Sequence, residues 1–368
     1  MKYLFVVQGE GRGHFTQALS LKSMLERNGH EVVAVMVGCS LKRSLPEFFT
    51  KKFTDKIISF KSPNFLPTPK GKHSPLLVSI LYNLLLLPVY IKSILTIRRT
   101  IQEKQPDVVV NFYELMCGFT YGIFNPAPPM MNVAHQYFLL TPAFNYTGKE
   151  IGEFRLLNFY TKLTALRSNK ILALSFREEA ESHYGKITIV PPLLRKEVLN
   201  QEVRHGNYIH GYMLNSGYAN ELAAWSGKHP QQPLHFFWDK KNVQPTENLT
   251  PMLTMHQLSD TLFLHYLAGC KAYATTGGFE SVCEAMYLQK PVLMVPAHIE
   301  QECNVIDAMQ SEAGVSAENF DLDLLLGFIP TTINRNREFQ YWIRSAESRY
   351  ITELTDTADE SSNVYATV

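Results

Sequence analysis

The first forty residues alternate between short apolar runs and a segment with helical spacing. Residues 3–7 (YLFVV) are apolar or aromatic throughout, which is typical of a strand buried on both faces of a sheet. Apolar side chains then recur at positions 18, 21, 24 and 25, which predicts a helix over 16–28 that ends at Gly29. Residues 31–37 (EVVAVMV) predict the next strand. Because this order makes a βαβ unit, we expect a parallel sheet.

The same alternation continues in two blocks. Further strands of the first block are predicted at 107–111, 130–134, 170–174 and 186–190. After two prolines and a polar stretch over 195–207, the second block predicts strands at 208–214, 234–237, 271–275 and 291–295, and helices at 218–226, 260–269, 279–288 and 301–313. We therefore expect an α/β protein with two doubly wound, Rossmann-like domains, 1–195 and 196–336. A last helix, about 337–354, could pack back onto the first domain.

Composition and charge narrow the class of protein. Apolar residues make up 45% of the 368 positions and charged residues 19%, which excludes a disordered or collagen-like chain. Residues 1–150 carry 17 Lys and Arg against 9 Asp and Glu, and the rest carry 18 against 25, so the halves have net charges of +8 and −7. This asymmetry suggests different partners for the two domains, or arises by chance. The sequence contains no basic stripe with interleaved aromatic residues, so a nucleic-acid partner is not expected.

The cysteines and the N-terminus indicate the compartment. Five widely spaced cysteines without a CxxC pair are typical of a reducing compartment and give no zinc signature. The first apolar run is too short for a signal-peptide core. We therefore expect a cytoplasmic protein, which could lie peripherally at the inner face of the membrane.

The most apolar stretch of the chain spans 76–97. Its polar residues and its proline argue against a membrane span: Ser79, Asn83, Pro88 and Lys92. One interpretation is a core helix kinked at Pro88. The other is a membrane-surface or lipid-acceptor region within 70–99, because lysines and arginines flank the run.

A glycine-rich turn follows the first predicted strand. It contains Gly9, Gly11 and Gly13 and ends at His14, and such a turn lets backbone N–H groups approach a ligand. It matches neither the dinucleotide fingerprint nor the P-loop, since the expected acidic residue and the Gly-Lys-Ser/Thr sequence are absent. His14 could act as a general base or simply cap the helix or face the core.

A second cluster of candidate residues lies in 275–304. Gly277 and Gly278 separate a predicted strand from a helix, whose N-terminus favours anions. Glu284 lies one turn beyond Glu280 on the same helix face and could accept two hydroxyl groups, as from a ribose. The next strand leads to further polar residues that are expected to rim the same crevice: His298, Glu300, Gln301 and Asn304.

This second cluster resembles the donor site of GT-B glycosyltransferases. The resemblance rests on the G-G-x-x-S-x-x-E-A pattern of Gly277, Gly278, Ser281, Glu284 and Ala285, followed by KPVLMVP and E-Q-x-x-N. The pattern is most similar to the MurG and monogalactosyl-diacylglycerol-synthase group. The turn ending at His14 is similar to the first-domain loop of that group. The fold implied is GT-B, with two Rossmann-like domains facing across a cleft.

The resemblance also implies roles for individual residues. In the donor site, Glu284 would bind the ribose, Gly277 and Gly278 the diphosphate, and Glu300 and Gln301 sugar hydroxyls, with Ser281, His298 and Asn304 beside them. His14 would be the base that deprotonates the acceptor, or would lie near the donor phosphates. Glu114 would orient His14 or the acceptor, unless it caps the helix that follows it.

One segment departs from the pattern of that group. Its second diphosphate loop is glycine-rich, whereas residues 214–218 (LNSGY) contain a single glycine. Asn215 and Ser216 could still donate hydrogen bonds there. No Asp-x-Asp metal motif is evident, so neither a metal nor another cofactor is expected.

The function expected is transfer of a hexosyl or N-acetylhexosaminyl group. The expected donor is a nucleotide-diphosphate sugar, namely a UDP-sugar, and the expected acceptor is a hydroxyl of a sugar, a lipid-linked molecule or a small molecule. Two alternatives stay open, namely a nucleotide-sugar epimerase or hydrolase on the same fold, and a non-catalytic sugar-nucleotide-binding protein.

Overall fold

The chain folds into two compact units. The computed structural model describes residues 1–40, 45–53, 56–63, 83, 85–213, 216–238, 244–329 and 336–365. Unit 1 comprises Met1–Asn145, Ile151–Arg195 and Ile343–Val368, and unit 2 comprises Tyr146–Glu150 and Lys196–Trp342. The chain therefore passes between the units more than once.

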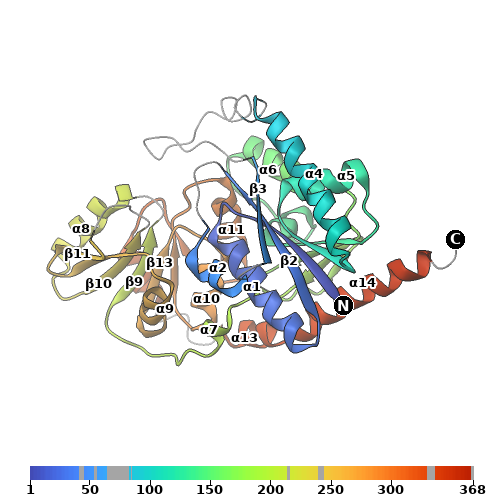
Figure 1. The fold of residues 1–368 in the computed structure, drawn as a ribbon. Helices are drawn as coiled ribbons and strands as arrows, with labels where there is room; N and C mark the ends of the chain where they lie inside the picture. The colour runs from blue at the N-terminus through green and yellow to red at the C-terminus, as the bar shows by residue number, and fades with distance from the viewer. Residues whose placement is uncertain are drawn as a thin grey trace. The chain divides into compact units, whose positions relative to one another are not determined.

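The sheet of unit 1 has the order β3-β2-β1-β4-β5-β6-β8-β7 among the described residues (Figure 1). All neighbouring strands pair in parallel except β7 with β8. The strands are β1 (Lys2–Gln8), β2 (Glu31–Cys39), β3 (Ile57–Lys61), β4 (Val108–Phe112), β5 (Met130–Ala134), β6 (Lys170–Leu174), β7 (His183–Tyr184) and β8 (Ile187–Val190). Because β1 and β4 are neighbours, the segments that follow them meet at the same edge.

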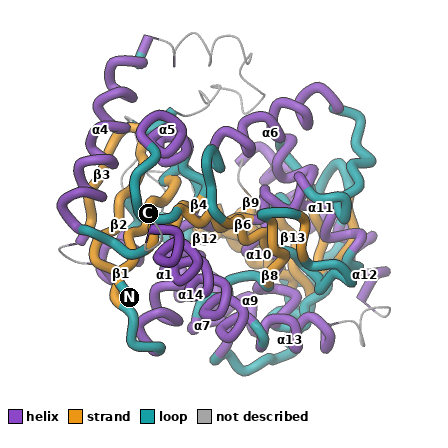
Figure 2. Tube along the Cα trace, turned by 90° about the vertical axis from the view of Figure 1, so that its right-hand side faces the viewer, coloured by secondary structure: helices purple, strands orange, loops and turns teal. Residues whose placement is uncertain are grey.

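Helices cover the unit 1 sheet (Figure 2). They are α1 (Arg12–Arg27), α2 (Glu47–Phe53), α4 (Leu87–Lys104), α5 (Leu115–Phe124), the 3₁₀ helix η2 (His135–Leu140), α6 (Ile151–Thr164) and α14 (Ala346–Tyr365). Buried aliphatic and aromatic side chains of β1, β2, α4 and α5 form one core cluster. This cluster fixes α4 and α5 side by side on the sheet.

Unit 2 repeats the design with the strand order β11-β12-β10-β9-β13-β14-β15 among its described residues. The strands are β9 (Ile209–Met213), β10 (Leu234–Trp238), β11 (Thr246–Thr250), β12 (Leu253–Gln257), β13 (Ala272–Thr275), β14 (Val292–Met294) and β15 (Gly314–Ser316). The helices are α7 (Lys196–Leu199), η3 (Ser216–Tyr218), α8 (Ala219–Lys228), α9 (Asp260–Gly269), α10 (Phe279–Tyr287), α11 (Ile299–Gln310), α12 (Leu322–Phe328) and α13 (Asn336–Arg344). The predicted α/β class with two doubly wound domains is confirmed.

Two predicted helices differ in the structure. The first helix begins at Arg12, so Gly13 and His14 lie in its first turn. Pro88 lies in the first turn of α4, where it breaks no internal hydrogen bond of that helix, and the kink predicted there stays a prediction. The predicted helix 337–354 is divided into α13 and α14 at residue 345. Residues 76–82 and 84 of the apolar stretch lie outside the described residues.

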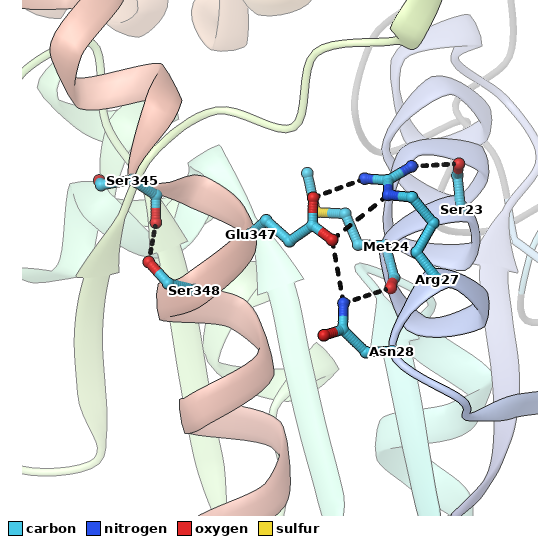
Figure 3. A network of polar contacts seen from close by, with 7 residues as sticks. All are labelled: Ser23, Met24, Arg27, Asn28, Ser345, Glu347 and Ser348. Carbon is cyan, nitrogen blue, oxygen red and sulfur yellow. Dashed lines mark hydrogen bonds and ion pairs between the residues drawn. The ribbon is translucent and has the colours of Figure 1, made fainter.

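The C-terminal helix α14 packs within unit 1 against α1 (Figure 3). Two guanidinium nitrogens of Arg27 donate to the Glu347 carboxylate at 3.3 and 2.7 Å, and the Asn28 amide donates to it at 2.9 Å. The hydrogen bond from Arg27 holds the pKa of Glu347 below its usual value. The fully buried Tyr350 donates its hydroxyl to the Pro191 carbonyl at 2.9 Å.

Replacing Tyr350 by phenylalanine should lower the stability of unit 1. The change removes one buried hydrogen bond and leaves the Pro191 carbonyl without its donor, which costs about 1–3 kcal/mol. Thermal unfolding followed by circular dichroism measures the loss. Glu347→Gln is the control, because the Arg27–Glu347 pair is half exposed and is worth less than about 1 kcal/mol. An equal or larger loss in Glu347→Gln would show that the buried hydroxyl does not anchor α14.

Candidate functional site

The glycine turn of unit 1 joins the ends of β1 and β2. Gly9 follows β1, and its N–H donates to the carbonyl of Gly38 in β2 at 2.8 Å. A Cβ on Gly9 would lie 2.4 Å from that carbonyl oxygen, so only glycine fits here. Glu10 accepts a hydrogen bond from the N–H of Ser40 at 2.7 Å. The turn is thus tied to β2, and α1 starts directly after it.

His14 lies in the first turn of α1 and is mostly buried, with 7% of its surface exposed. Its Nδ1 lies 3.3 Å from Oε1 of the buried Gln17, and its ring stacks on Tyr113 with centroids 5.7 Å apart. Tyr113 follows β4 and has the left-handed backbone conformation, with φ of 61°. The structure therefore places His14 at the edge where β1 and β4 end.

Glu114 caps α5. Its Oε1 accepts hydrogen bonds from the N–H of Met116 at 3.0 Å and from the Ser62 hydroxyl at 2.5 Å, while the Asn111 side chain accepts from its N–H. Its Oε2 is buried and has no hydrogen-bond partner. The hydrogen bonds of the carboxylate therefore go to Ser62 and α5 and not to His14. This agrees with the alternative in which Glu114 caps the helix that follows it.

The Glu114 carboxyl group fills the space where Gly38 lacks a side chain. A Cβ on Gly38 would lie 2.2 Å from Oε2 and 2.6 Å from Cδ of Glu114. Gly38→Ala should therefore destabilise the protein by about 1–3 kcal/mol through overpacking. In the Glu114→Ala background the same change should cost less, which a double-mutant cycle of denaturation midpoints measures. Equal costs in the two backgrounds would show that another group is the obstacle.

Burial raises the pKa of Glu114 to about 7, because the charged form loses its hydration. The folded state therefore binds this proton more tightly than the unfolded state, so the contribution is stabilising at low pH. This stabilising contribution is fully present below pH 4.5, the ordinary pKa of the glutamate side chain, and it is lost as pH rises through about 7.

Glu114→Gln should remove that pH dependence. The amide oxygen can still accept from Ser62 and Met116, so above pH 7 the variant should gain up to about 3 kcal/mol over the wild type. Denaturation midpoints from pH 5 to 8 measure the difference between the two proteins. Burial lowers the pKa of His210, His235 and His256. These histidines change the stability with pH in the opposite direction to Glu114, but they do so equally in the wild type and in the variant. A constant difference across this range would contradict the assignment.

In unit 2 the candidate site forms where β13 passes into α10. Gly277 has φ of 81°, and a Cβ there would lie 2.6 Å from Cγ2 of Val305, so both the turn and the packing require glycine. Gly278 is the N-cap residue of α10, and the hydroxyl of Ser281 donates to its carbonyl at 3.0 Å. Glu284 lies further along α10 and is almost fully buried.

Two buried amides of α11 hold this turn. Gln301 accepts from the N–H of Ala297 at 2.9 Å and donates to the Thr276 hydroxyl at 3.4 Å. Asn304 donates to the Gly277 carbonyl at 3.2 Å. The loops after β13 and β14 are thereby joined. His298, the N-cap residue of α11, and Glu300 in its first turn are partly exposed beside them.

Other contacts were not evident from the sequence. Tyr146, which belongs to unit 2, donates its hydroxyl to the Glu302 carboxylate of α11 at 3.1 Å. Ser62 reaches Glu114 across 52 positions of the chain. Neither pair has a local sequence pattern. Asn215 lies outside the described residues, and Ser216 is described only as the start of η3.

The described residues include side chains and helices that bear on metal binding and membrane insertion. Within them, no group of three or more His, Cys, Asp or Glu side chains is placed to hold a metal ion. The five cysteines are buried and unpaired by disulfides. Across the same ranges, every helix is too short or too polar to cross a bilayer.

The comparisons with known proteins identify the family. A family model described as Glycosyl transferase family 1 matches residues 1–331. The chain belongs to glycosyl transferase family 1. None of the curated proteins that were compared matches this family 1 chain.

Solved structures agree with the GT-B fold. The glycotransferase of kitacinnamycin has a TM-score of 0.67 at 13% identity, over 97% of this chain and 98% of the other. The calicheamicin glycosyltransferase CalG4 has a TM-score of 0.65 at 14% identity, over 96% and 98%. Phytolacca americana UGT2, in complex with UDP-2fluoro-glucose and pterostilbene, has a TM-score of 0.62 at 11% identity, over 97% and 99%. At these identities the likeness supports the fold and not a substrate.

Proposed function

We propose that the protein transfers a sugar from a nucleotide-diphosphate donor, UDP-linked, to a hydroxyl group of an acceptor without a metal ion. The observation that carries the proposal is the turn of Gly277 and Gly278, held by Gln301 and Asn304, at the carboxyl end of β13 in a family 1 glycosyltransferase. The Phytolacca structure contains a UDP-sugar analogue, and a further match, Arabidopsis UGT89C1, contains UDP-L-rhamnose. We assign the transferred group to the hexosyl or N-acetylhexosaminyl class.

The donor is assigned to unit 2. The N-terminus of α10 presents backbone N–H groups and the positive end of the helix dipole, which suit a diphosphate. We assign Glu284 to the two ribose hydroxyls, and Ser281 and His298 to the same site. Glu300 and Gln301 are assigned to the sugar hydroxyls. An amide nitrogen carries two donors, and the contact of Gln301 with Thr276 uses one of them.

The acceptor is assigned to unit 1. His14 would remove the proton from the attacking hydroxyl, since it lies at the carboxyl ends of β1 and β4 beside the turn of Gly9, Gly11 and Gly13. Glu114 is assigned a positioning role through Ser62 and α5. Helix ends and side chains would stabilise the charge of the leaving diphosphate in place of a metal.

Several finer assignments rest on the sequence. We place the protein nearest the MurG and monogalactosyl-diacylglycerol-synthase group, and we infer a cytoplasmic protein with a lipid-linked or anionic acceptor, as the basic first half suggests. Relatives of the same fold include Arabidopsis UGT89C1 with quercetin, so a small aromatic acceptor is the competing class.

Product analysis by mass spectrometry tests the proposal. Incubation with UDP-glucose or UDP-N-acetylglucosamine and a panel of acceptors should give a glycoside and UDP in equal amounts. An isomeric UDP-sugar without acceptor would instead identify an epimerase, and free sugar with UDP would identify a hydrolase. Tight donor binding without any product would identify a sugar-nucleotide-binding protein.

A further inference from the structure

The apolar surface of the helix α4 is wider than the part that the core of unit 1 covers. Tyr90, Ile94, Ile97 and Ile101 point into the core of unit 1 and are buried. Leu87, Ile91 and Leu95 lie about a quarter turn around the helix from this buried row, and they are 52%, 50% and 48% exposed. These three residues follow each other at four-residue spacing, so they form one row along the helix. A surface helix of a water-facing protein normally carries polar side chains there.

Exposed apolar side chains are concentrated at this helix. Among the described residues, 13 large apolar side chains are exposed, and five of them fall between Leu85 and Leu95. Single exposed leucines are ordinary, whereas a continuous patch marks an interaction surface. Helix α5 lies beside α4 (Figures 1 and 2) and carries a further exposed apolar residue, Ile123, which is 63% exposed.

The second half of the same face is basic. The apolar row is followed by Arg98 and Arg99, with Lys92 beside it, and all three are exposed. Arg98 lies over the ring of Phe124 at 4.3 Å, which keeps it next to the apolar patch. Glu103, the one acidic residue in the sequence of α4, pairs with Arg99 at 2.8 Å. The four cations of α4, which include Lys104, therefore outnumber its anions by three.

We propose that the outer face of α4 docks on an anionic lipid bilayer. The aliphatic row of Leu87, Ile91 and Leu95 would enter the boundary between headgroups and acyl chains, while Lys92, Arg98 and Arg99 contact lipid phosphates. The helix would lie along the surface rather than cross the bilayer. A protein partner fits less well, because interface cores favour aromatic side chains over lysine-flanked aliphatic ones. The inference does not depend on the chemistry proposed for the site.

Sedimentation with lipid vesicles tests the docking surface. The full chain should bind vesicles of phosphatidylcholine and phosphatidylglycerol and bind pure phosphatidylcholine much more weakly. Serine at Leu87, Ile91 and Leu95 together should lower the partition coefficient roughly 100-fold. Lys92→Gln, Arg98→Gln and Arg99→Gln should each lower it about fivefold on the anionic vesicles only.

Matched variants separate docking from misfolding and from other occupants. Leu324→Ser removes a 40% exposed leucine on α12 of unit 2 and should leave vesicle binding unchanged. UDP affinity of the triple serine variant should equal that of the wild type, which shows that the chain is folded. Absence of vesicle binding by the wild type would overturn the proposal. So would a wild-type dimer that the triple variant converts to monomer in light scattering, since the face would then bind a second copy.

Discussion

His14→Ala is expected to reduce sugar transfer by about 10²–10⁴-fold, the usual contribution of a general base. The reason is its position in the first turn of α1, at the edge of the unit 1 sheet where β1 and β4 end. Initial rates at saturating donor measure the effect. UDP affinity should stay within about twofold, because the donor is assigned to unit 2.

Burial of His14 calls for a second variant, since alanine could also disturb the stacked Tyr113. His14→Gln keeps a polar side chain beside Gln17 and Tyr113 but cannot take the proton. It should lose activity as fully as alanine does while its melting temperature stays closer to the wild type. Substantial activity in the glutamine variant would contradict the assignment of His14 as the base.

Glu284→Ala should weaken UDP binding by roughly 10- to 100-fold. A carboxylate that accepts two ribose hydroxyls makes two charge-assisted hydrogen bonds, each worth about 1.5–3 kcal/mol, from which the loss of its own burial cost is subtracted. Isothermal titration calorimetry measures the change.

Glu280→Ala is the matched control for Glu284. Glu280 lies on the same helix face one turn earlier and is less buried, so its removal should change UDP affinity by no more than about threefold. UMP should lose as much affinity as UDP in the Glu284 variant, because the ribose is common to both. Unchanged UDP affinity in Glu284→Ala would show that the ribose binds elsewhere.

Continuous apolar runs predicted the sheets well. Most predicted strand ends agree with the observed ends to within one residue, as for the strands predicted to end at Asn111, Ala134, Leu174 and Thr275. Of the two strands in the first forty residues, the observed β2 extends two residues beyond its prediction. β3, β7, β11 and β12 were not predicted. The sequence of β11, TENLT, is polar and largely exposed, and β11 pairs only at the sheet edge. β15 is three residues long, which is too short for a periodicity to appear.

The candidate site was predicted as a set of residue types and not as a set of contacts. Glycine at 277 follows from a turn between strand and helix, and its φ of 81° agrees with that requirement. The hydrogen bonds from Gln301 and Asn304 join segments about 25 positions apart, and no spacing along the chain predicts such pairs. The same holds for Gly38, whose need for glycine comes from a carboxyl group 76 positions away, at Glu114. Sequence spacing gives neighbours on one element, whereas these contacts depend on how the sheet brings elements together.

Calorimetric titration of the wild-type protein with UDP, TDP, GDP and ADP tests whether unit 2 binds a nucleotide-diphosphate sugar. We predict that UDP binds in preference to the purine nucleotides, and that the preference needs no added metal ion. Failure of all four nucleotides to bind would contradict the donor site and, with it, the proposed transferase function.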